Sequence, residues 1–207
     1  MLGLVIRCYF AMLAVQVVAI IYVKLDGDVL TAVEADTIGI AAIAIGVALR
    51  HRALVTHAYH TLGWSWRGYA LVLLAAPVVV FAVAAYVRGV TSLFGQQGWH
   101  ALDELEGHSQ ALVVAVVAIA PALYEELAFR GLIFGALRES FSAREAIFIS
   151  AFAFALLHLS LPSLVTHLPL GLYFGWLRYR SGSMWPSTFA HFCHNLGVIV
   201  ADACGWT

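Results

Sequence analysis

Long runs of apolar residues divide the chain, and they constrain its fold more than any other feature. Seven runs approach the ~20 residues that a helix needs to cross a bilayer. They cover residues 4–23, 29–49, 68–87, 110–137, 143–159, 162–177 and 184–204. Of the 207 residues, 62% are apolar and only 11% are charged, which is too few charges for a water-soluble surface. We therefore expect an all-α, multi-pass membrane helix bundle of about seven transmembrane helices, forming one domain over residues 1–207.

Basic residues gather in alternate connections between these runs. They are Arg50, Arg52 and Arg67 after the second run, Arg138 and Arg144 around the fourth connection, and Arg178 and Arg180 after the sixth run. Lys24 and Arg88 are the exceptions. Because basic loops favour the cytoplasmic side, this pattern predicts a cytoplasmic N-terminus and an external C-terminus. The connection 92–107 contains Trp99 and is expected to lie at the outer membrane interface.

Three ionisable residues lie inside the fourth run: Glu125, Glu126 and Arg130. A charged side chain at the centre of a span costs ~2.5–3.5 kcal/mol on insertion scales, so such groups are expected to be paired. Arg130 follows Glu126 by about one helical turn, so the two share a face and can form an ion pair. Glu125 lies about 140° around the helix from Arg130. It lacks that partner and is a candidate general base.

Further polar residues lie in the fifth and seventh runs. His158 lies near the end of one, and His191 and Asn195 lie four residues apart on one face of the other. The helical rise places Glu125 about 20 Å, His158 about 21 Å, Asn195 about 17 Å and His191 about 11 Å from the basic ends of their helices. Three helices are therefore expected to bring polar groups to one layer of a bilayer core that is ~30 Å thick.

Other interpretations of these residues compete with a catalytic site. A scaffold protein could use Glu126 and Arg130 only to lock its helices together, although this leaves Glu125 unexplained. A membrane transporter or proton-relay protein could use the buried Glu, Arg and His groups, but the sequence lacks the paired repeats that many transporters show. His167 and His194 are weaker candidates, because a lone histidine on an apolar helix is more often a satisfied core residue.

Three ordered motifs resemble those of the CPBP (CAAX protease and bacteriocin-processing, or Abi) family of intramembrane proteases. They are Glu125-Glu126-x-x-x-Arg130 followed by Gly131, then Phe154-x-x-x-His158, then His191-x-x-x-Asn195. The resemblance covers roughly residues 110–200. It implies that Glu125 and His158 activate water, that His191 and Asn195 hold the oxyanion, and that Glu126 and Arg130 support the site.

The resemblance also implies an organisation and a reaction. Residues 1–93 are expected to form accessory N-terminal helices and residues 109–204 the catalytic core, in the inner (cell) membrane of a bacterium. The implied substrate is a membrane-anchored protein: one with a C-terminal anchor, a prenylated or CAAX-like protein, or a bacteriocin-type precursor. The net charge of −1 gives no indication of a nucleic acid partner.

The catalytic type is open between two mechanisms. We favour a glutamic-type protease without a cofactor, because the chain has no HExxH motif and asparagine is a poor zinc ligand. The alternative is a metalloprotease in which Glu125, His158 and His191 hold Zn²⁺, with a water molecule in the fourth position.

Overall fold

The computed structural model describes residues 1–94, 105 and 107–206, and the regular structure of this part is helical. Its long helices are α1 (Leu2–Lys24), α2 (Val29–Arg50), α4 (Trp66–Phe94), α8 (Ala143–Leu157), α9 (Leu161–Ser181) and α10 (Trp185–Ala203). The segments from α5 (Gln110–Val113) to α7 (Phe134–Leu137) form one further continuous helix, Gln110–Leu137, which we call the central helix. A short helix, α3 (Arg52–Tyr59), follows α2. Each predicted run is thus a helix, and the all-α bundle is confirmed.

The bundle has the surface of a membrane protein. Within the described residues, four helices are long and apolar enough to cross a bilayer: Leu2–Lys24, Val29–Arg50, Trp66–Val90 and Gln110–Leu137. On α4, Leu71, Leu74 and Val78 are 68%, 73% and 70% exposed, which suits contact with lipid rather than with water. The chain is therefore an integral membrane protein. Since α8, α9 and α10 are shorter or more polar, the total of seven crossings stays a prediction.

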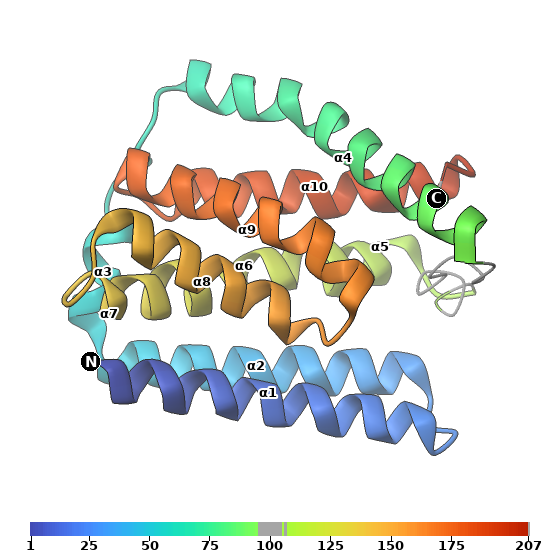
Figure 1. Ribbon diagram of the computed structural model, residues 1–207, viewed down its shortest axis with the longest axis horizontal. Helices are drawn as coiled ribbons and strands as arrows, with labels where there is room; N and C mark the ends of the chain where they lie inside the picture. Colours follow the sequence, from blue (N-terminus) through green and yellow to red (C-terminus); the bar gives the residue numbers. More distant parts are fainter. Residues whose placement is uncertain (95–104, 106, 207) are drawn as a thin grey trace.

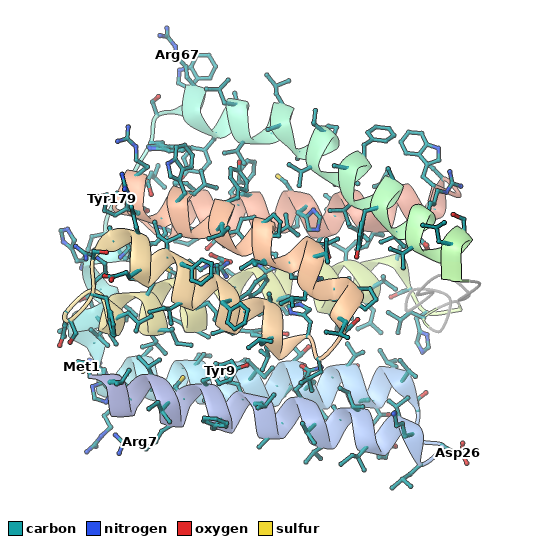
Figure 2. The ribbon with its side chains drawn as sticks, viewed as in Figure 1. Met1, Arg7, Tyr9, Asp26, Arg67 and Tyr179 are labelled. Carbon is teal, nitrogen blue, oxygen red and sulfur yellow. The ribbon has the colours of Figure 1, made fainter. Side chains whose placement is uncertain are left out.

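The long helices run alternately in opposite directions (Figure 1). The α1–α2 hairpin forms one edge of the bundle, α4 forms the opposite edge, and the central helix, α8, α9 and α10 lie between them. The N-terminus and the arginine-rich connections share one end. Figure 2 shows Arg7 and Arg67 toward the end that holds Met1, and Asp26 at the other end. The interfacial stretch predicted at 92–107 falls mostly on residues 95–104 and 106, outside the described part of the chain.

Small residues let α8 and α9 pack closely. A Cβ atom added to Gly171 would lie 3.0 Å from Ala151, and one added to Gly175 would lie 3.1 Å from Ile147. The same spacing of small residues lets helices approach closely in membranes. The connection between these two helices is also short. His158 caps the end of α8, Leu159 has φ 50° in the left-handed region, and Ser160 caps the start of α9.

The central helix is not a regular α-helix. It widens into π-helical turns at η2 (Val114–Ile119) and η3 (Leu127–Ile133), on either side of α6 (Ala120–Glu126). Pro121 lies at the start of α6 and has no backbone N–H to continue the α-helical pattern. The sequence predicts regular α-helical spacing throughout this run, and the helix departs from that expectation. Such π-helical turns frequently occur at functional sites.

Candidate active site

Glu126 is the centre of a buried polar cluster. Its Oε1 atom lies 2.9 Å from Arg130 Nη1, in the ion pair that the sequence spacing predicts. The same oxygen accepts a hydrogen bond from His191 Nδ1 at 3.0 Å. The Glu126 and Arg130 side chains have no exposed surface, and that of His191 is 5% exposed. This cluster joins the central helix to α10.

Arg130 is held by polar and aromatic groups of the neighbouring helices. Its Nη2 donates to the carbonyl oxygen of Gly171 at 3.2 Å. Its Cζ lies 4.5 Å from the ring centroid of Phe154 and 5.3 Å from that of Phe174. A guanidinium over aromatic rings gains cation–π stabilisation when it is removed from water. Arg130 thereby ties α8 and α9 to the central helix next to Glu126.

Glu125 lies beside this cluster and remains partly accessible. Its side chain is 14% exposed, and its Oε2 atom lies 3.7 Å from His191 Nε2. That separation is longer than a direct hydrogen bond, so the carboxylate is close to the imidazole without being bonded to it. The His191 ring stacks on Phe174, with centroids 4.9 Å apart. His191 is thus fixed between the two carboxylates, with one nitrogen toward each.

His158 caps α8 instead of lying inside it. Its Nδ1 is 3.0 Å from the carbonyl oxygen of Phe154. Because a carbonyl can only accept, Nδ1 carries the hydrogen, and the neutral ring keeps a lone pair on Nε2. The Phe154 ring lies 5.0 Å from the His158 ring and 5.9 Å from the His191 ring. The α8–α9 turn stops short of the bundle end marked by the α1–α2 turn (Figure 1).

Asn195 reaches the central helix through its backbone. Its Nδ2 donates to the carbonyl oxygen of Val117 at 3.0 Å. In an α-helix that oxygen would accept from residue 121, but Pro121 has no N–H. Within the described residues, Asn195 makes no hydrogen bond to another predicted site residue. The structure therefore brings Glu125, Glu126, Arg130 and His191 into direct proximity, links His158 to them through Phe154, and anchors Asn195 on η2.

His167 is a residue that the sequence analysis ranked low and that the structure places at the site. Its ring centroid lies 3.7 Å from that of His158. The signal in the sequence was the short Ser160-Leu161-Pro162 segment after His158, which is typical of a helix start and so of a tight hairpin. His194 lines a cavity of about 10 Å³ between α4, α9 and α10, together with Phe174 and other apolar residues.

The predicted zinc ligands are only partly gathered. Glu125 and His191 approach within 3.7 Å, but His158 makes no hydrogen bond to either within the described residues. In that part of the chain, no three His, Cys, Asp or Glu side chains form a group that could hold a metal ion. The two carboxylates lie on either side of the His191 imidazole, which is hydrogen-bonded to Glu126.

Comparisons with known proteins match the region that contains these residues. Residues 107–197 match a family model described as type II CAAX prenyl endopeptidase Rce1-like. The putative membrane peptidase YdiL of Bacillus subtilis (strain 168) is 34% identical over 89 residues, which are 43% of this chain and 36% of that protein. The chain thus aligns with little more than a third of that relative. The matches confirm the resemblance inferred from the three motifs.

Proposed function

We propose that the protein is an intramembrane endopeptidase that hydrolyses a peptide bond in a membrane-anchored protein, because residues 107–197 match the type II CAAX prenyl endopeptidase Rce1-like family model. The observation that supports this most is the partly exposed Glu125 carboxylate beside His191, which the buried Glu126–Arg130 pair holds in place. A carboxylate near a fixed imidazole inside an apolar bundle is suited to proton transfer from water.

In the proposed mechanism, Glu125 takes a proton from water, and His158 assists through Nε2. The water oxygen attacks the substrate carbonyl carbon, and the proton then passes to the leaving amine. His191 and Asn195 donate to the developing oxyanion. Since His191 Nδ1 is bonded to Glu126, His191 donates from Nε2 only when both nitrogens carry hydrogen. Asn195 keeps one of its two N–H groups after bonding Val117.

The substrate class follows from the family. The description of the matching model names CAAX prenyl endopeptidases, so a prenylated or CAAX-like C-terminus is the first substrate to test. A C-terminal anchor and a bacteriocin-type precursor are the others. The similarity to a Bacillus subtilis putative membrane peptidase supports a location in the inner (cell) membrane of a bacterium. A cytoplasmic N-terminus is supported because the arginine-rich connections share the end that holds Met1 (Figure 1).

The decisive test compares membrane proteomes of cells with the wild-type gene, without it, and with Glu125→Gln. A precursor that accumulates in the last two identifies the substrate. The purified protein in liposomes should then cleave this precursor. Glu125→Gln and His158→Ala should lower turnover ~10²–10⁴-fold, the range for lost acid–base groups. Glu34→Gln removes an exposed carboxylate of α2 and should retain turnover. Wild-type turnover in Glu125→Gln would contradict the mechanism.

The same assay distinguishes the two catalytic types. A glutamic-type site keeps its turnover after chelation, and the purified protein carries no stoichiometric metal. In the alternative, zinc held by Glu125, His158 and His191 supplies a metal-bound water. Stoichiometric zinc whose removal abolishes cleavage would overturn our preference. A transporter would instead carry protons across liposomes that lack any peptide substrate, which a pH-sensitive dye inside the liposomes detects.

A further inference from the structure

His167 of α9 lies against the proposed catalytic His158, outside the three motifs. The two ring centroids are 3.7 Å apart, and the ring planes are inclined by 37°. Both side chains are half-buried. Phe154 backs the pair, with its ring 5.0 Å from His158 and 5.9 Å from His167. The Phe154 ring thus lies next to both imidazoles and also 5.9 Å from the His191 ring.

The two histidines are anchored in the same way. His158 Nδ1 donates to the carbonyl of Phe154 at 3.0 Å, and His167 Nδ1 donates to the carbonyl of Ser163 at 2.8 Å. In each case the acceptor lies four residues earlier in the chain. Thr166 Oγ1 lies 3.1 Å from the same His167 nitrogen and donates to Ser163 as well. Both neutral rings therefore keep a lone pair on Nε2.

The hairpin of α8 and α9 fixes this pairing. The left-handed Leu159 and the Ser160 cap turn the chain immediately after His158. About three turns after Ser160, a Cβ atom added to Gly171 would lie 3.0 Å from Ala151, so the two helices are closely packed. The turn and this contact together set the backbone positions from which the His158 and His167 rings meet.

We propose that His167 is a positioning residue for the hydrolytic water, and this rests on the proposed function. A water molecule that attacks a carbonyl loses one hydrogen to the base and keeps the other. The Glu125–His158 side takes the first hydrogen, and His167 Nε2 accepts a hydrogen bond from the second. The water oxygen then forms the new C–O bond with its remaining O–H still bonded to His167. An oriented nucleophile raises the rate without a change in substrate affinity.

The test uses His167→Phe, which keeps an aromatic ring against His158 and removes both nitrogens. We expect kcat to fall ~10–100-fold with KM within about twofold, as expected for lost orientation. His167→Gln, which restores a polar acceptor, should recover part of kcat. The control is His57→Phe, which makes the same change at an exposed histidine of α3, and it should retain wild-type kcat.

A His167→Phe variant with wild-type kcat would overturn the proposal and assign His167 to packing alone. If His167→Phe does not fold, the ¹⁵N signals of the ring nitrogens in the folded wild-type protein decide. A substrate-analogue amide should shift His167 Nε2 if a shared water lies there, and an unchanged signal would overturn the proposal. Glu125→Gln is run in parallel. If Glu125→Gln cleaves the substrate like the wild type, the proposed function is wrong. If Glu125→Gln loses its turnover while His167→Phe keeps the wild-type kcat, only the proposed role of His167 is wrong.

Discussion

At the scale of single residues, the site depends on polar atoms that satisfy one another in an apolar interior. The Glu126 carboxylate forms an ion pair with Arg130 and accepts a hydrogen bond from His191. Its charge is therefore compensated by groups from two helices. Removing one member of such a buried set generally costs more than the pair gains, because the remaining charge is left uncompensated. The Val117 carbonyl is an uncharged group that is satisfied from another helix. Pro121 has no N–H to donate to it, and Asn195 Nδ2 donates to it instead, at 3.0 Å.

Asn195→Ala should destabilise the protein by ~1–3 kcal/mol, because it removes the side-chain donor to the partly buried Val117 carbonyl. Pro121→Ala supplies a backbone N–H four residues after Val117. The double variant should therefore unfold at a higher temperature than Asn195→Ala alone, as measured by thermal unfolding in detergent. Its turnover should stay low if Asn195 also donates to the oxyanion. An Asn195→Ala variant as stable as the wild type would show that this hydrogen bond contributes nothing.

At the scale of helices, the close packing of α8 and α9 determines where His158 and His167 lie. The α8–α9 turn is short, and Gly171 fits directly against Ala151. Arg130 adds a cross-link by donating to the Gly171 carbonyl. A small residue at this point thus serves both the helix contact and the position of the buried arginine.

Gly171→Ala should lower stability by ~1–3 kcal/mol, because overpacking forces neighbouring groups to shift. It should also reduce turnover, since separating α8 from α9 moves both histidines. The control is Gly89→Ala in α4, where an added Cβ meets nothing within 4 Å. This change should be neutral or stabilise the helix by up to ~1 kcal/mol. Denaturant unfolding and peptide cleavage measure the two effects, and a Gly171→Ala variant that matches Gly89→Ala in both would contradict this account.

The contacts within and between helices differ in how far they could be predicted from the sequence. The pairing of Glu126 with Arg130 was predictable, because both lie on one helix and depend only on local spacing. The π-helical turns were not predictable in this way, because the spacing argument assumes a regular α-helix. To predict that His167 approaches His158, both the length of the α8–α9 turn and the contact of Gly171 with α8 would have to be known. The structure brings Glu125, Glu126, Arg130 and His191 together, but the hydrogen-bond partner of each group could not be read from the sequence.

At the scale of the whole molecule, the alternation of helices gives the bundle two unlike ends. The arginine-rich connections lie at the end with the N-terminus, and the C-terminus lies at the opposite end (Figure 1). Figure 2 places Asp26 at that second end as well. If basic loops stay in the cytoplasm, the C-terminus faces the outside. The native cysteines offer a direct test, since Cys204 is exposed whereas Cys8 and Cys193 are buried.

A membrane-impermeant maleimide added to intact spheroplasts should label the protein at Cys204, because this thiol follows α10 at the external end. Buried thiols react slowly, so Cys8 and Cys193 should contribute little, and Cys204→Ser should abolish the signal. Lysis before labelling should not raise the yield. Labelling that appears only after lysis would reverse the orientation and move the arginine-rich end outside. The proposed site would then have to receive its substrates from the opposite side, although the contacts of Glu125, His158 and His167 would be unchanged.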